Sequence, residues 1–385
     1  MATEASSPDA SSMGDAGTFD ATVDSGATVD SGATVDSGAT VDSGATVDSG
    51  ATVDSGDVAF DAPGSPETGS TVPVDASLLP PWEDGGCPAP SRIVLFSGWD
   101  QATFETVPGT WQWDGSAWTL ADTDAGTGDG GSEPEQRYLA SIGGICGRAV
   151  LFGGSDGVGN AFGDQWTWDG ASWSSVPLAT DGTAPVGTWS AAAGVLNGGL
   201  VVFGGTQENA IAVSDTWVFG GTEWTHMQVF SALPPARSAT AMAPFHDGLL
   251  LLGGVDINGF VLADAWIWNG STWTPTIAPP VPLYYAAAAS LGTTVVLFGG
   301  FDISGTIRGD TWIWDGTQWT MAMTPNGPSA RFSPSMATLG GVVVLYGGAD
   351  LDHSLNDTWL WDGTNWTDTH QTGPGPREGA AMTSF

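Results

Sequence analysis

Short apolar runs recur along most of the chain, and each ends in two glycines or in Ser-Gly. Each run contains four or five consecutive aliphatic, β-branched or aromatic residues, which is too short for a buried helix and fits a strand covered on both faces. The runs, with their glycines, occupy residues 92–98, 149–154, 200–205, 249–254, 294–300 and 342–348. The pattern therefore predicts six copies of one buried strand.

A second pattern follows every apolar run: aromatic residues at alternate positions, a turn, and another tryptophan. In residues 311–320, TWIWDGTQWT, the alternation marks one face of a strand, and Asp-Gly supplies the positive φ angles of a tight turn. The first tryptophans of successive copies are 46 to 55 residues apart. They are Trp111, Trp166, Trp217, Trp266, Trp312 and Trp359. Each copy therefore predicts a hairpin after the buried strand.

A further segment before the apolar run, such as GTWSAAAG at 187–194, supplies a fourth strand per copy. A four-stranded sheet of this size cannot bury both of its faces alone, so the copies must pack against one another radially. Over residues 91–385 the diglycines and spaced tryptophans resemble the kelch repeat. The resemblance implies an all-β fold, a six-bladed β-propeller of four-stranded antiparallel blades.

The ends of the repeat region complement each other. The first copy lacks its leading strand, and the chain ends in REGAAMTSF at 377–385, which matches that strand. Because kelch propellers close by sharing one blade between opposite ends of the chain, the resemblance implies that blade 1 combines 91–120 with 377–385. The other blades are expected at 136–177, 186–228, 236–277, 283–323 and 330–370.

Residues 1–90 differ in composition, and we expect a disordered, acidic, low-complexity tail. The hexapeptide ATVDSG occurs six times from Ala21 to Gly56, and its isolated valines bury too little to offset backbone ordering at roughly 1–2 kcal/mol per residue. One carboxylate per six residues is a poor match to calcium-binding β-roll repeats. The tail resembles the spacers of bacterial surface lipoproteins, so we expect an extracellular or cell-surface protein with a signal upstream of Met1. The sequence itself contains no signal peptide, which leaves a cytoplasmic location open.

The formal net charge is −36, and all seven basic residues are arginines. Such a charge argues against nucleic acid and anionic membranes as partners. No run of about eighteen apolar residues occurs, so we expect no membrane insertion by this chain. We expect a monomer.

Residues suited to catalysis are sparse. Cys87 and Cys146 permit one disulfide, which would hold the end of the tail in an oxidising compartment, and they exclude a four-cysteine zinc site. Galactose oxidase shares the kelch propeller, and its copper site needs histidines, tyrosines and a tyrosine cross-linked to cysteine. The histidines of this chain, at positions 226, 246, 353 and 370, fall at unrelated places in the blades. We therefore expect no catalytic residues, no metal and no cofactor.

Arginine offers a sharper candidate. Arg137, Arg237 and Arg331 each lie sixteen residues before the first glycine of their pair, and Arg377 holds the same place in the C-terminal strand. Arg137, Arg331 and Arg377 belong to consecutive blades, so their guanidinium groups could bind an anion such as a carboxylate at the channel mouth. Alternatively, each arginine pairs with one of the aspartates that recur around the loops of the blades. Both alternatives stay open.

The long loops between the second and third strands share one face with the loops between blades, and we expect this face to bind ligand. Trp99, Arg308 and His353 lie on it, as does the acidic stretch 121–136. The candidate ligand-binding residues are Arg137, Arg331, Arg377, Trp99, Arg308 and His353. We expect a non-enzymatic binding or adhesion module for a glycan or a protein. The alternative is a propeller enzyme acting on sugars, either an oxidase similar to galactose oxidase or a sugar-acid epimerase.

Overall fold

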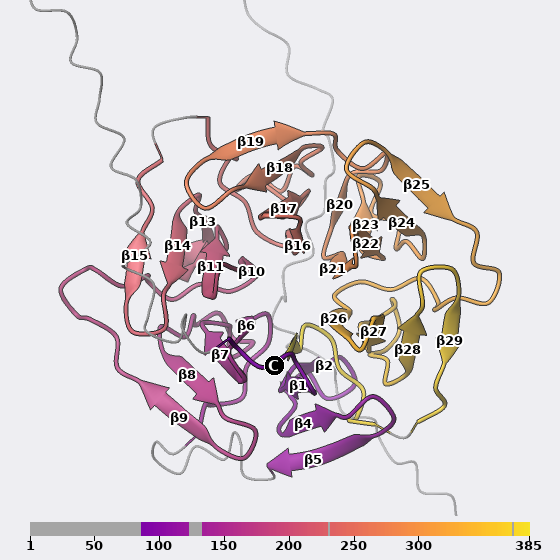
Figure 1. Cartoon of the computed structure of the whole chain (residues 1–385), viewed down its shortest axis with the longest axis horizontal. Coiled ribbons are helices and arrows are strands. Elements are labelled where there is room, and N and C mark those ends of the chain that lie inside the picture. The colour runs from indigo at the N-terminus through magenta and orange to yellow at the C-terminus, as the bar shows by residue number, and fades with distance from the viewer. Residues whose placement is uncertain (1–85, 123–132, 230–231, 372) are drawn as a thin grey trace, which may run out of the picture. The chain divides into compact units, whose positions relative to one another are not determined.

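A computed structural model describes residues 86–122, 133–229, 232–371 and 373–385, so most of the predicted tail at 1–90 lies outside the described residues. Six four-stranded antiparallel sheets surround a central channel, as Figure 1 shows. The all-β, six-bladed propeller that the repeats predict is therefore confirmed.

Blade 1 joins the two ends of the repeat region. From the channel outward it contains β30 (Ala381–Ser384), β1 (Ile93–Phe96), β4 (Thr110–Trp113) and β5 (Trp118–Asp122). Ile93 pairs with Ser384 and Phe96 pairs with Ala381. Closure of the ring by the C-terminal strand is confirmed, and β5 runs two residues past the predicted end at position 120.

The other five blades repeat this order of inner, second, third and outer strand. Blade 2 contains β6 (Ser141–Ile145), β7 (Arg148–Phe152), β8 (Gln165–Trp168) and β9 (Trp173–Val176), and blade 3 contains β10 (Ala192–Leu196), β11 (Gly199–Phe203), β14 (Thr216–Phe219) and β15 (Trp224–His226). Blade 4 contains β16 (Ala241–Phe245), β17 (Gly248–Leu252), β18 (Ala265–Trp268) and β19 (Trp273–Thr276). Blade 5 contains β21 (Ala287–Leu291), β22 (Thr294–Phe298), β24 (Thr311–Trp314) and β25 (Trp319–Ala322), and blade 6 contains β26 (Ser335–Leu339), β27 (Val342–Tyr346), β28 (Thr358–Trp361) and β29 (Trp366–Asp368).

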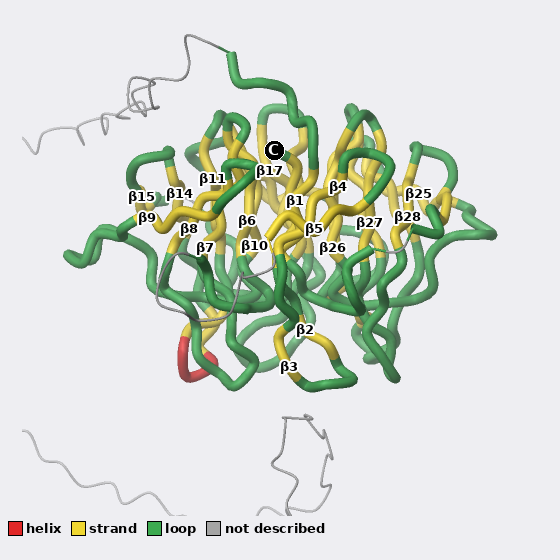
Figure 2. The backbone as a smooth tube through the Cα atoms, turned by 90° about the horizontal axis from the view of Figure 1, so that it is seen from below, coloured by secondary structure: helices red, strands yellow, loops and turns green. Residues whose placement is uncertain are grey.

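Short paired segments lie in the loops on one side of the blades. They are β2 (Trp99–Asp100) with β3 (Glu105–Thr106), β12 (Thr206–Gln207) with β13 (Ile211–Ala212), and β20 (Leu283–Tyr284) with β23 (Phe301–Asp302). The short 3₁₀ helix η3 (Glu208–Ala210) links β12 to β13. Figure 2 shows β2, β3 and the helix on the side with the longer loops. We call this side the long-loop face and the opposite side the short-turn face.

The tryptophans of the hairpins fill the spaces between blades. Trp113, Trp168, Trp268, Trp314 and Trp361, all on third strands, are almost fully buried. Outer-strand tryptophans donate across to the neighbouring blade: Trp173 Nε1 bonds Thr110 Oγ1 at 2.8 Å, and Trp366 Nε1 bonds Thr311 Oγ1 at 2.9 Å. Each such ring removes about 150–250 Å² from water, so repeating it in every blade stabilises the whole ring.

The hairpin turn differs from the prediction in detail. In blade 5 only Gly316 has a positive φ, 97°, and the Asp315 carboxylate accepts the backbone N–H groups of Thr317 and Gln318 at 2.7 and 2.9 Å. The aspartate caps a four-residue loop with its side chain instead of adopting the left-handed conformation.

Candidate functional site

Six backbone pairings surround the channel on the long-loop face. In each, a residue just after a diglycine pairs with a residue just before an inner strand. The pairs are Trp99–Glu378, Tyr138–Ser155, Trp189–Thr206, Ser238–Val255, Tyr284–Phe301 and Phe332–Ala349. We call these twelve residues the mouth. Half of them are aromatic, which concentrates planar apolar side chains where the channel opens.

A closed ring of hydrogen bonds lies directly beside the mouth. Its members follow the inner mouth residues in the chain, and each donates its backbone N–H to the equivalent carbonyl of the neighbouring blade at 2.7–3.0 Å. They are Leu139, Ser190, Ala239, Tyr285, Ser333 and Gly379, all with φ between 47° and 57°. Five of them are not glycine, so the left-handed backbone is held by the ring itself. The mouth therefore stands on a rigid base.

The aromatic side chains of the mouth contact one another. Trp99 and Tyr138 have ring centroids 5.3 Å apart, and Phe301 lies 5.2 Å from Tyr284 and 4.6 Å from Phe332. Trp99 also covers the backbone of Gly157, where an added Cβ would lie 2.1 Å from the indole ring. Trp99 is thus placed by blades 1 and 2 together.

Glu378 is a buried carboxyl group within this aromatic surface. It is 8% exposed, and its nearest polar contact is Gln101 Nε2, 3.5 Å from Oε1. Oε2 has no hydrogen-bond partner among the described residues. Burial raises the pKa of Glu378 to about 7. Near neutral pH this side chain is therefore present both as an acid and as a carboxylate.

Two tyrosines next to Glu378 are affected by the same surroundings. Burial, followed by the charges of Tyr285 and Glu378, raises the pKa of Tyr138 to about 12. Burial also raises the pKa of Tyr285, and the Ser190 side chain opposes that rise. Both phenols stay neutral at physiological pH and can donate a hydrogen bond to a ligand.

Three of the candidate arginines are internal. Arg137, Arg237 and Arg331 are at most 1% exposed and form ion pairs with Asp164, Asp264 and Asp357. Burial is the largest single influence and raises the pKa of these carboxyl groups, but the hydrogen bonds and charge of the arginine, together with the tryptophan hydrogen bond, outweigh it, so the pKa is lowered. Arg137 and Arg331 thus form the aspartate pairs that the sequence left open as one of two alternatives.

The remaining candidates lie apart from one another. Arg377 is 2% exposed and forms no ion pair with any described residue. Arg308 pairs with Asp310 at 2.5 Å, and His353 lies 3.2 Å from Asp350. Only Trp99 belongs to the mouth.

The aspartates that follow the diglycines hold the long loops. Asp256 Oδ1 accepts the N–H groups of Asn258 and Phe260 at 2.8 and 2.9 Å, and Asp302 does the same for Ser304 and Thr306. The backbone hydrogen bond from Phe260 lowers the pKa of Asp256. These carboxylates therefore cap the backbone amides of the loops.

The short-turn face contains the covalent link of the chain. Cys87 and Cys146 form a disulfide with Cα atoms 4.6 Å apart. The C-terminus lies nearby, because Ser91 N donates to the Phe385 carbonyl at 3.0 Å. This face therefore fixes the start of the propeller, whereas the mouth lies on the other face.

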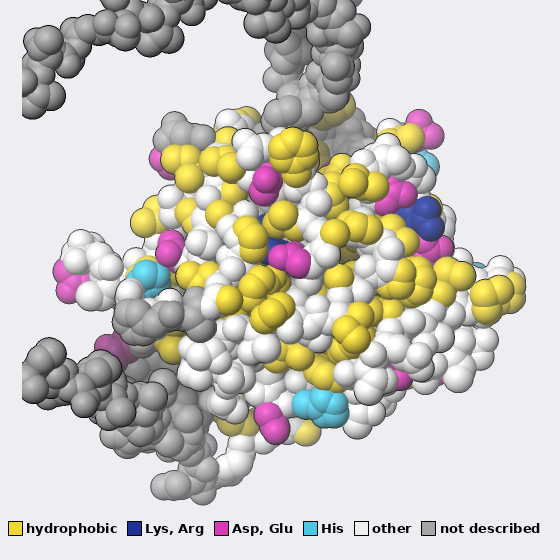
Figure 3. Space-filling view, turned by 90° about the horizontal axis from the view of Figure 1, so that it is seen from above, with side chains coloured by type: hydrophobic (Ala, Val, Ile, Leu, Met, Phe, Trp, Pro, Cys, Tyr) yellow, Lys and Arg dark blue, Asp and Glu magenta, His cyan; other side chains and the backbone are white. Residues whose placement is uncertain are grey.

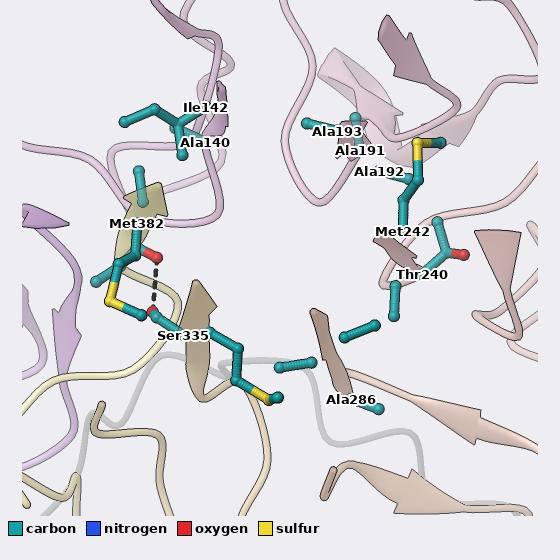
Figure 4. A pocket seen from close by; sticks show the side chains of 16 residues that line it. Ala140, Ile142, Ala191, Ala192, Ala193, Thr240, Met242, Ala286, Ser335 and Met382 are labelled. Carbon is teal, nitrogen blue, oxygen red and sulfur yellow. Dashed lines mark hydrogen bonds between the residues drawn. The ribbon is translucent and has the colours of Figure 1, made fainter. Parts of the chain in front are cut away.

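The channel itself holds a cavity of about 170 Å³ lined mainly by alanine and methionine. Figure 4 shows Met242, Met382 and Ser335 among its walls, with Ser335 Oγ donating to the Ala380 carbonyl at 2.8 Å. None of the described residues that line it has a charged side chain. Polar recognition is therefore better served by the mouth than by the channel.

Other surfaces offer less. Among the residues that the structure describes, no three His, Cys, Asp or Glu side chains gather closely enough to hold a metal ion. Within the same residues, no helix has the length and hydropathy that crossing a bilayer requires. Figure 3 shows hydrophobic side chains scattered over the visible side of the propeller and very few basic ones.

The sequence interpretation missed most of the mouth. Glu378, Tyr138, Tyr284 and Phe332 occupy one equivalent position, directly after the arginine position of each blade, where the residue type changes from blade to blade. Aligning the six copies and searching for the variable position directly after the one that is arginine in four of them would have found them.

The comparisons with known proteins agree with this architecture. The KLHDC2/KLHL20/DRC7 Kelch-repeats domain model matches residues 87–276 and 223–385. No curated protein is a significant match. Kelch propellers are commonly protein-binding modules. Since the two matches together span the entire propeller, the chain belongs to the kelch-repeat family.

Proposed function

We propose that the protein is a non-enzymatic binding module that holds a glycan or a protein segment at the mouth on its long-loop face. The observation that carries the proposal is the group of aromatic residues around Glu378, a buried carboxyl group whose Oε2 has no partner among the described residues. Aromatic rings provide rigid apolar area, and a few well-placed polar groups then fix the orientation of the ligand.

The rigidity of the mouth supports binding. The closed hydrogen-bond ring and the contacts of Trp99 with Tyr138 hold the side chains before any ligand arrives. A preformed surface loses little conformational entropy on binding, which favours affinity.

One observation favours a second candidate, a propeller enzyme acting on sugars. The pKa of about 7 at Glu378 suits a general acid or base at neutral pH. Binding alone accounts for the aromatic surface, so we place this candidate second.

The test is a screen of neutral and acidic oligosaccharides and of a peptide library against the full chain, followed by three variants. We expect Trp99→Ala and Tyr138→Ala to weaken the selected ligand about tenfold or more, because each removes a large aromatic contact. Phe260→Ala is the matched control, since Phe260 is an aromatic residue 70% exposed on a blade 4 loop outside the mouth.

If Trp99→Ala and Tyr138→Ala both bind the ligand with wild-type affinity and melt at the wild-type temperature, the mouth is not the binding surface. The enzyme would be favoured if the wild type converts a bound sugar to product and Glu378→Gln still binds the sugar but does not convert it.

A further inference from the structure

Blades 2, 4 and 6 hold a carboxylate in one shared geometry. In blade 6, Arg331 Nε donates to the Ser329 carbonyl at 3.0 Å and Nη1 donates to the Gly347 carbonyl at 2.9 Å. Nη1 and Nη2 then donate to the two oxygens of Asp357 at 2.5 and 2.9 Å. The Trp359 indole N–H completes the arrangement with a 2.7 Å bond to Asp357 Oδ2. Blades 2 and 4 use the corresponding groups.

Blade 1 repeats the donors of this arrangement. Arg377 Nε donates to the Gly375 carbonyl at 3.0 Å and Nη1 donates to the Ser97 carbonyl at 2.9 Å. These two bonds match those that hold Arg331, so the guanidinium group is fixed in the same pose. Trp111 occupies the position of Trp359.

The acceptor is the part that differs. The residue equivalent to Asp357 is Gly109, which has no carboxylate. A Cβ built on Gly109 would lie 3.1 Å from Trp111 Nε1 and 3.3 Å from Leu120 Cδ1, so the indole nitrogen and a leucine methyl group border the place where that side chain would begin. None of the described carboxylates forms an ion pair with Arg377.

The electrostatics favour an anion there. Burial lowers the pKa of Arg377 to about 10, which shows that its surroundings disfavour the isolated charge. A buried guanidinium group that gains a bidentate carboxylate recovers charge-assisted hydrogen bonds.

The same position borders the solvent in the three blades that hold an aspartate. The equivalent aspartate side chains, in blades 2, 4 and 6, are 41%, 33% and 31% exposed although their arginines are buried. In blade 1 Gly109 is buried and the half-exposed side chain of Leu120 lies beside it, so a carboxylate would enter by displacing Leu120.

We propose that blade 1 binds the carboxylate group of a small organic acid, with Arg377 and Trp111 as donors, at the position that an aspartate side chain fills in blades 2, 4 and 6. This site is distinct from the mouth and does not depend on the function proposed for it.

The experiment uses the full chain with acetate as the probe and acetamide and chloride as controls at constant ionic strength. NMR follows the indole N–H signals, and the signal of Trp111 is assigned as the one lost in Trp111→Phe. We expect acetate to shift this signal in a saturable way while acetamide leaves it in place. In both proteins the acetate affinity is also measured from the rise in melting temperature with acetate concentration. By that measure Trp111→Phe should weaken acetate binding about tenfold, because it removes one hydrogen bond to a charged acceptor.

Trp359→Phe is the matched control. It removes the same N–H from blade 6, where Asp357 is the acceptor, so it should lower stability without changing acetate affinity. Glucuronate distinguishes the sources of the carboxylate. Tighter binding than acetate, still sensitive to Trp111→Phe, would support a sugar acid, and equal binding would support short aliphatic acids.

Two results would overturn the proposal. One is a Trp111 signal that does not respond to acetate. The other is acetate affinity that is equal in the wild type and Trp111→Phe.

Discussion

The hairpins of the blades and the mouth of the channel come from the same repeat but differ in how strictly they repeat it. The buried third-strand tryptophan recurs in five blades and is replaced by Phe219 in blade 3. At the mouth, the equivalent residues include Tyr138, Ser238 and Glu378.

The difference has a physical cause. A hairpin tryptophan fills the space between two blades, and that space is the same six times around the ring, so each copy needs a similar side chain. The mouth residues lie at the ends of the blades beside the inner strands, where the residue type differs from blade to blade. Their side chains are therefore available for ligand recognition.

The arginine–aspartate pairs recur among the blades less strictly than the hairpin tryptophans and more strictly than the mouth residues. They are complete in blades 2, 4 and 6, whereas Thr188 and Leu283 replace the arginine in blades 3 and 5. In blade 5 Asp310 pairs with Arg308 instead, and Trp312 Nε1 has no partner among the described residues. The ring tolerates loss of a pair where the framework of strands is intact.

The largest test of the framework is to end the chain at Pro376. This removes β30, which pairs with β1 along four residues and buries Ala381 and Met382. Blade 1 would keep three strands and leave the faces of its neighbours open, so we expect cooperative loss of the folded state by circular dichroism. Replacing residues 101–104 with two glycines removes loop residues but no blade strand, and should cost about 1 kcal/mol or less. Equal melting of the truncated and full chains would contradict the shared blade.

The sequence predicts the strands and hairpins of the blades well and the mouth poorly. Apolar runs, glycines and tryptophans such as Trp168 determine strands through burial, which leaves a periodic pattern along the chain. Glu378 and Tyr285 come together only because the ring closes, and no local pattern records that closure. Arg137 and Arg331 lie at repeated positions, and their aspartate partners are 27 and 26 residues away in the same blade.

The second test concerns the covalent link on the short-turn face. Cys87→Ser should destabilise the oxidised protein by about 4 kcal/mol, because the disulfide joins residues 59 positions apart and restricts the unfolded chain. The measurement is urea unfolding with and without dithiothreitol. The reductant should lower the unfolding free energy of the wild type to that of the variant. If the unfolding free energy of the wild type is the same with and without reductant, the disulfide does not stabilise the protein.

The third test removes a complete ion pair. Arg331→Met should cost about 3 kcal/mol, because it leaves the Asp357 carboxylate and two carbonyl groups without their donor. Arg308→Met is the control: Arg308 is 34% exposed, so its loss should cost about 1 kcal/mol or less.

The same pair predicts a pH dependence. Because the folded pKa of Asp357 is lowered, the stability from this pair is present above the unfolded value near 3.8 and is lost as the pH falls through the folded value. Unfolding free energies of the wild type and Arg331→Met should therefore converge at low pH. A constant gap down to about pH 2 would show that the loss comes from packing.

The smallest effect is expected at the mouth, from Glu378→Gln. The folded pKa of Glu378 is raised from 4.5 to about 7, so the folded state holds its proton more tightly than the unfolded state. Stability from this group is full below about pH 4.5 and is lost as the pH rises to about 7. That rise in pKa corresponds to at most about 3 kcal/mol, and we expect about 2 because solvent at the mouth relieves part of the burial. The glutamine variant should match the wild type at pH 4 and exceed its unfolding free energy by about that amount at pH 8. Tyr284→Phe, which keeps the ring at the mouth and removes only a hydroxyl group, should show no such pH-dependent gap below pH 8. A gap of the same size at pH 4 and pH 8 would mean that Glu378 acts through shape and not through its proton, and the mouth would then resemble the framework more than we infer.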